Sequence, residues 1–122
     1  MSKIYVKFET PKEIADKAYE AIELARSTGK IGKGANEVTK YVERAQAALV
    51  VMSENVEPEE ILAHISLICD ERGIPYLYVP DKMELGKACG LSVNASTACV
   101  VTPGKARELI EEISETVAAL KK

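Results

Sequence analysis

A continuous apolar run at residues 47–52, AALVVM, limits the possible folds of this chain of 122 residues more than any other part of its sequence. The run has no alternating polar residues, which is typical of a strand that is buried on both faces of a sheet. Further buried strands are expected at 74–79, where Pro75 is tolerable near the start, and at 97–101. Strands of this kind need helices on both sides of the sheet, so the predicted fold class is α/β.

Helical patterns alternate with these strands. A helix is predicted over residues 11–27, where apolar side chains recur near helical spacing. Its start is marked by Thr10 as N-cap, by Pro11 and by Glu13. Gly29 is the natural stop of this helix, and a short extended piece is expected just after it. Further helices are expected from Asn36 to Ala45, from Pro58 to just before Gly73, from an Asp81 cap to near Gly90, and from Thr102-Pro103 to about Leu120.

The composition describes one ordinary globular domain, with 47% hydrophobic and 29% charged residues. Three widely spaced cysteines, Cys69, Cys89 and Cys99, fit neither a disulfide framework nor a zinc site. We expect them to be small buried side chains in a reducing cytosol. No signal pattern or membrane-spanning run is evident, so the expected location is cytoplasmic.

The segment 31–40, IGKGANEVTK, first suggests a phosphate-binding loop but fails the specific tests. A Walker loop needs lysine and then serine or threonine where Ala35 and Asn36 stand. A dinucleotide-binding fingerprint needs a third glycine where Glu37 stands. The sequence therefore disfavours a nucleotide-hydrolysing or NAD-dependent enzyme.

The same region is basic within an acidic chain. Residues 26–44 hold five basic and two acidic side chains, a local net charge of +3 in a chain whose net charge is −3. Phosphate groups respond to the field within a Debye length of about 8–10 Å, so this local charge favours a nucleic-acid backbone. We expect Gly32 and Gly34 to let that backbone approach closely, beside a helix whose N-cap is Asn36.

A phosphate-binding role does not explain Glu37, because phosphate repels a carboxylate. A carboxylate accepts hydrogen bonds from base edges, and a sheared G·A pair leaves the N1–H and N2–H edge of guanine free. Such pairs occur in bent RNA and not in regular duplex, whose deep major groove excludes side chains. The pattern therefore favours base recognition by Glu37, with Asn36 and Lys40 near the neighbouring acceptors.

Other interpretations stay open on the residues alone. Glu37 and Lys40 also suit a surface ion pair worth roughly 0.2–0.5 kcal/mol. A small cytosolic α/β enzyme with a ligand pocket at the 90–97 loop is a second alternative, although the single histidine, His64, is more simply a packed or surface residue of a helix. A protein-interaction module that uses the acidic C-terminal helix is a third, and it leaves the basic region without a purpose.

Several stretches, in order along the chain, closely resemble the ribosomal L-seven-Ae family of kink-turn RNA-binding proteins. They are KGANEVTK (33–40), VER (42–44), VEPEEILAH (56–64), GIPYLYV (73–79), LGKACG (85–90) and LSVNAS (91–96). The resemblance covers essentially the whole chain, and the archaeal form is similar in length and in lacking extensions. It implies a three-layer α/β/α sandwich with a central four-stranded mixed sheet.

The resemblance also implies partners. Archaeal members of the family are shared subunits that bind kink-turns of ribosomal RNA, of box C/D and H/ACA guide RNA and of ribonuclease P RNA. Other core proteins of these ribonucleoproteins are the implied protein partners. The resemblance implies no catalytic residue, cofactor, metal ion or membrane partner, and a protein that is a monomer when free.

Finally, the resemblance implies a set of RNA contacts. Asn36, Glu37 and Lys40 would recognise the tandem sheared G·A pairs. The remaining contacts would be with the RNA backbone (Lys33, Gly34, Lys82, with Arg44 assisting), near a flipped-out nucleotide (Glu57), and on the RNA bulge (Leu91, Val93, Ala95).

The chain departs from the family pattern in three places. Glycine commonly follows VER, whereas Ala45 stands here. The helical stretch HISLIC, residues 64–69, lacks a proline that is usual in the family. Val93-Asn94 replaces the Arg-Pro of some relatives, in the loop that tunes which kink-turns are accepted.

Overall fold

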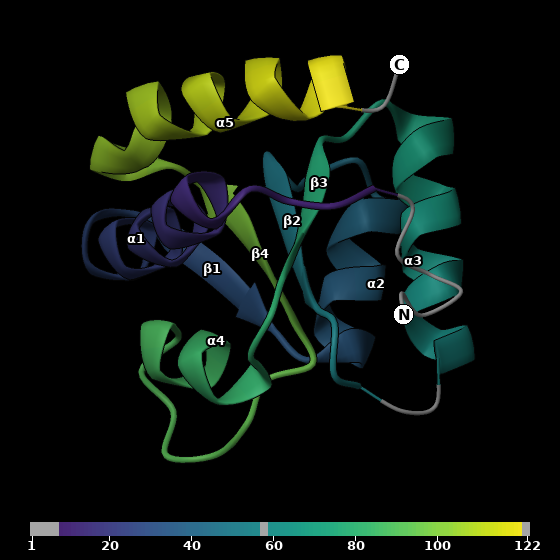
Figure 1. The fold of residues 1–122 in the computed structure, drawn as a ribbon, viewed down its shortest axis with the longest axis horizontal. Helices are drawn as coiled ribbons and strands as arrows, with labels where there is room; N and C mark the ends of the chain where they lie inside the picture. Colours follow the sequence, from purple (N-terminus) through teal and green to yellow (C-terminus); the bar gives the residue numbers. More distant parts are fainter. Residues whose placement is uncertain (1–7, 57–58, 121–122) are drawn as a thin grey trace.

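The central sheet has four strands within the residues described, 8–56 and 59–120, of a computed structural model. The strands are β1 (Lys30–Lys33), β2 (Leu49–Ser53), β3 (Tyr76–Val79) and β4 (Thr97–Thr102). Their spatial order is β1-β4-β2-β3, with β2 parallel to β3 and β4 antiparallel to both β1 and β2. Therefore β1, β2 and β3 all end at the edge of the sheet where β4 begins (Figure 1).

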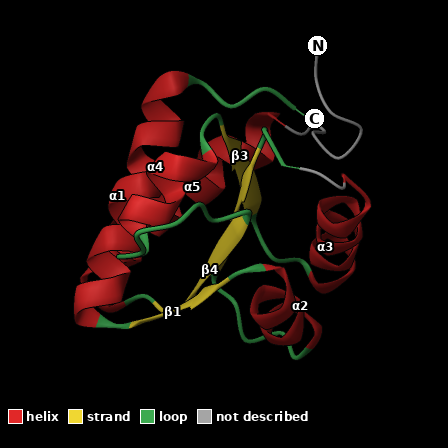
Figure 2. Ribbon diagram, turned by 90° about the horizontal axis from the view of Figure 1, so that it is seen from below, coloured by secondary structure: helices red, strands yellow, loops and turns green. Residues whose placement is uncertain are grey.

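Helices cover both faces of this sheet, as Figure 2 shows. They are α1 (Lys12–Thr28), α2 (Ala35–Glu43), α3 (Glu59–Arg72), α4 (Lys82–Ala88) and α5 (Arg107–Leu120). Leu49 and Val51 of β2 belong to the apolar layer under α1, α4 and α5. Val50 and Met52 belong to the layer under α2 and α3. Since strand residues alternate between two covered faces, the predicted α/β/α sandwich with a four-stranded mixed sheet is confirmed.

The first helix begins without the predicted threonine cap. It starts at Lys12, and no side chain in the described part of the chain caps its first turn. The Thr10 hydroxyl instead accepts a hydrogen bond from the backbone N–H of Tyr78, at 3.3 Å. The prediction of Thr10 as N-cap is therefore wrong, because this hydroxyl serves the edge strand β3. The predicted stop is confirmed, since the Gly29 N–H donates the last bond to Ala25 O at 2.7 Å.

The predicted N-cap of α4 is confirmed, whereas α5 starts later than predicted. Asp81 caps α4 as predicted, because its side chain accepts a hydrogen bond from the Met83 N–H at 2.9 Å. The final helix does not start at Pro103, because a 3₁₀ turn, Gly104–Ala106, comes first and α5 begins at Arg107.

In the described residues no helix combines the length and apolar character needed to span a membrane.

Candidate nucleic-acid interface

Several segments meet at the edge of the sheet where β1, β2 and β3 end. The turn into α2 is joined to β4 by a hydrogen bond from the Gly34 N–H to Thr97 O, at 2.9 Å. The segment after β2 is joined to α4 by a bond from the Lys82 N–H to Asn55 Oδ1, at 3.0 Å. The loop before β4 is joined to α4 by a bond from the Ala95 N–H to Lys82 O, at 3.0 Å. We call this region, at the bottom of Figure 1, the loop edge; it consists of residues 33–37, 54–56, 80–82 and 90–97.

Gly34 makes the turn from β1 into α2. Its φ of +85° lies in a region that L side chains rarely adopt, and a Cβ there would meet nothing within 4 Å. Its carbonyl accepts the first helical hydrogen bond, from the Val38 N–H at 3.0 Å. The prediction of Asn36 as N-cap is therefore wrong, and its exposed side chain lies within the first turn. Among the described residues no side chain caps this helix, so its first N–H groups are open to an anion.

A groove runs along the exposed side of α2. It is lined by Asn36, Glu37, Lys40, Tyr41 and Arg44. With a rise of 1.5 Å per residue, the eight steps from Asn36 to Arg44 span about 12 Å. Among the described residues Glu37 forms no ion pair, so the interpretation as a surface pair with Lys40 is not supported. The groove thus presents a free carboxylate between an amide and two cations.

Gly32 does not provide the close approach to RNA that the sequence predicts. It is buried, and a Cβ there would lie 2.9 Å from the Cys99 sulfur and 2.9 Å from the Tyr41 ring. The missing side chain therefore makes room for the Tyr41 ring between β1 and α2. Above the same ring, Lys30 Nζ lies 5.4 Å from the centroid, a cation–π contact. Sequence reasoning missed Tyr41 because its contacts come from another element.

The loop of residues 90–97 exposes one predicted contact and buries another. Val93 is 66% exposed, and Leu91 is half-buried. Ala95 is only 3% exposed, and its side chain packs into the core under α1 and α4, so its contact with RNA stays a prediction. Another predicted contact, Glu57, lies outside the described residues.

Two predicted lysines flank the groove and the loop. Lys33 is exposed at the end of β1, and Lys82 is partly exposed at the start of α4. The backbone of Lys82 is fixed on both sides, by Asn55 and by Ala95. Asn55 was not singled out from the sequence, because an asparagine after a strand is common in turns and no spacing marks it.

Among the described residues, the cysteine and histidine side chains do not form a nucleophile–base pair. Cys69, Cys89 and Cys99 are all buried, as predicted. Burial raises the pKa of Cys89 to about 11 and that of Cys99 to about 12, so both stay protonated at neutral pH. His64 is exposed on α3. The described residues form five surface hollows, and none of these five is lined by residues of the 90–97 loop, where the enzyme alternative would need its ligand pocket.

Comparison with known proteins identifies a family and a similar solved structure. The model of the ribosomal protein L7Ae/L30e/S12e/Gadd45 family matches residues 16–110 of this chain. Among solved structures, the chain is similar to the Giardia lamblia 15.5kD RNA binding protein, with 30% sequence identity and a TM-score of 0.91. That similarity covers 97% of this chain and 98% of the other.

Proposed function

This chain belongs to the ribosomal protein L7Ae/L30e/S12e/Gadd45 family, and we propose that it is a non-catalytic, RNA-binding subunit of ribonucleoproteins that recognises kink-turn RNA. The similar Giardia lamblia structure is described as an RNA-binding protein, which supports the general part of this proposal. The single observation that carries the specific part is the exposed Glu37 carboxylate, unpaired among the described residues, in the groove of α2.

The groove can distinguish bases because it combines acceptors and donors. The Glu37 carboxylate accepts from the N1–H and N2–H groups of a guanine whose edge is free, as in a sheared G·A pair. The Asn36 amide both donates and accepts, and the Lys40 ammonium donates to base acceptors. Phosphate alone does not select a carboxylate at this position, because the two groups repel each other.

The surroundings of the groove suit the backbone of a bent RNA. Lys33, Lys82 and Arg44 supply positive charge at the loop edge and at the far end of the groove. The open first turn of α2, entered through Gly34, offers N–H groups to a phosphate. The apolar Val93 and the half-buried Leu91 offer a surface for an unstacked base. Glu57 remains a proposed contact near a flipped-out nucleotide.

We propose the same assemblies for this chain that its resemblance implies. These are the large ribosomal subunit, box C/D and H/ACA guide ribonucleoproteins and ribonuclease P, in the cytoplasm, with the other core proteins of those particles as partners. The free protein is proposed to be a monomer, without cofactor or metal ion.

A titration with two RNAs tests the proposal. One RNA contains a kink-turn, and the other is identical except that its G·A pairs are converted to Watson–Crick pairs. We expect the kink-turn RNA to bind more tightly by at least about tenfold, the effect of one good base contact. Equal affinity for the two RNAs would reject base recognition by the groove.

A further inference from the structure

We propose that Gly86 is the positioning residue of the 90–97 loop, because the backbone carbonyl of Val93 occupies the space that a Cβ would need at this position. This contact fixes where the exposed Val93 side chain meets RNA. The RNA part of the inference rests on the proposed function, whereas the geometry of the loop can be tested without any RNA.

The contact between Gly86 and the loop leaves no room for a side chain. A Cβ at Gly86 would lie 2.1 Å from Val93 O, 3.1 Å from Val93 C and 3.3 Å from Asn94 Cα. All three are backbone atoms, so no side-chain rotation relieves the clash. A glycine inside a helix costs about 0.5–1 kcal/mol relative to alanine, and its position in α4 is explained by this contact and not by helix propensity.

Hydrogen bonds tie the loop to the same helix on either side of Val93. Before it, the Leu91 N–H donates to Gly86 O at 2.9 Å. After it, the Ala95 N–H donates to Lys82 O at 3.0 Å. The loop is therefore held at three of its residues, Leu91 and Val93 at Gly86 and Ala95 at Lys82.

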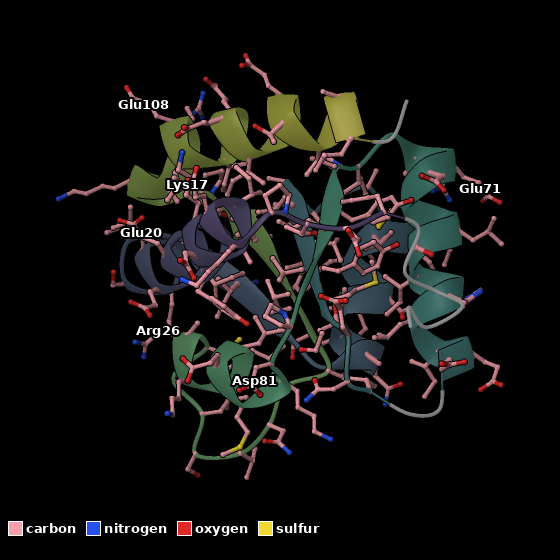
Figure 3. The ribbon with its side chains drawn as sticks, viewed as in Figure 1. Lys17, Glu20, Arg26, Glu71, Asp81 and Glu108 are labelled. Carbon is pink, nitrogen blue, oxygen red and sulfur yellow. The ribbon has the colours of Figure 1, made fainter. Side chains whose placement is uncertain are left out.

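The turn at the end of α4 lies against a side chain of the first helix. Gly90, with a φ of +78°, turns the chain from α4 into the loop. A Cβ at Gly90 would lie 2.3 Å from Arg26 Nη1, so the guanidinium covers this turn. Figure 3 shows Arg26 reaching from α1 toward α4. With both ends of the loop fixed, a displacement at Gly86 is transmitted to Val93, whose side chain is 66% exposed.

A matched pair of glycine substitutions tests the inference. Gly29→Ala creates a similar clash, since a Cβ there would lie 2.0 Å from Thr102 O, but at the end of the sheet away from the loop edge. Both Gly86→Ala and Gly29→Ala should lower the melting temperature. At a temperature where both are folded, we expect Gly29→Ala to bind kink-turn RNA as the unmodified protein does. Gly86→Ala should bind about tenfold more weakly, the loss of one contact to the RNA.

The preference for G·A pairs distinguishes an effect on the 90–97 loop from an effect on the groove of α2. Gly86→Ala should keep the ratio of affinities for kink-turn and Watson–Crick-converted RNA, because Glu37 lies on α2 and not on α4. Equal binding of kink-turn RNA by Gly86→Ala and Gly29→Ala would overturn the inference. If the unmodified protein does not distinguish the two RNAs, the proposed function fails, and amide exchange then decides the inference about Gly86.

Amide hydrogen exchange needs no RNA. The N–H groups of Leu91 and Ala95 should exchange faster in Gly86→Ala and at the unmodified rate in Gly29→Ala. Unchanged protection of both amides in Gly86→Ala would overturn the inference. Should Gly86→Ala not fold, insertion of one glycine between the exposed Val93 and Asn94 displaces Val93 without a clash. This variant should fold and lose the same affinity for kink-turn RNA, whereas unchanged affinity would overturn the inference.

Discussion

At the scale of single residues, Ala45 has a backbone conformation that its side chain opposes. Its φ is +55°, in the left-handed region. The Gln46 N–H bonds to Tyr41 O at 2.8 Å and the Ala45 N–H to Val42 O at 3.0 Å, which is the pattern that glycine usually completes at a helix end. We expect Ala45→Gly to raise the free energy of unfolding by about 0.5–1 kcal/mol, as measured by urea denaturation.

A second alanine provides the control for this substitution. Ala118 is exposed within α5, where glycine only loosens the backbone. Ala118→Gly should therefore lower the free energy of unfolding by up to about 1 kcal/mol. The same chemical change then has opposite signs at the two sites. A destabilised Ala45→Gly variant would contradict the assignment of strain to residue 45.

Glu37 is the residue on which RNA discrimination should depend. We expect Glu37→Ala to weaken binding of kink-turn RNA by about 1–3 kcal/mol, the range for one good base contact. Glu43 is an exposed carboxylate of the same helix that does not line the groove. Glu43→Ala removes the same charge, so it should leave the affinity unchanged or slightly higher. Fluorescence anisotropy on both variants checks this, and equal losses would contradict base recognition.

At the scale of elements, the Asp81 cap is expected to hold the start of α4. The helix has only seven residues, so one capping bond is a large part of its stabilisation. Asp81→Ala should lower the free energy of unfolding by about 1 kcal/mol, whereas Asp81→Asn keeps an acceptor and should cost only a few tenths. Chemical denaturation of the two variants measures the difference. Equal losses would show that charge, and not the cap, is what matters at this position.

The elements themselves could be predicted because their patterns are local. The run at 47–52 predicted β2, and Asp81 predicted the cap of α4, since each depends on neighbours in the sequence. Gly32 was misinterpreted because the Tyr41 ring that covers it belongs to another element. The burial of Ala95 could not be predicted because a loop of small residues has no periodicity to tell inward from outward side chains. Contacts between elements could therefore not be predicted from the sequence, and the contact between Gly86 and Val93 is one of them.

At the scale of the whole molecule, part of the acidic surface lies on the layer opposite the groove. The acidic helix α5 lies in the layer opposite α2, and Figure 3 shows Glu20 and Glu108 projecting from α1 and α5. Salt screens charges beyond about 8–10 Å, so acidic groups on the far layer act weakly on RNA at the groove. The net charge of −3 is thus compatible with a locally basic binding surface.

The two cysteines with raised pKa link stability of the whole core to alkaline pH. Burial raises the pKa of Cys89 from 9.0 to about 11 and that of Cys99 from 9.0 to about 12. Because these folded-state values lie above the unfolded value, the stabilisation is fully present below about pH 9 and is lost as pH rises toward the folded-state values. Each thiol should lower the free energy of unfolding by about 1.4 kcal/mol per pH unit within its own window.

Denaturation at a series of pH values between 8 and about 11 measures this slope. A variant with Cys89→Ala and Cys99→Ala should be less stable at pH 8, because two buried groups are truncated, but its stability should fall less steeply with pH. Some slope should remain, since burial also raises the pKa of Tyr19 and Tyr76. An identical slope in the two proteins would mean that the thiols do not ionise on unfolding in this range, and the buried thiols would then have no part in the alkaline limit of the fold.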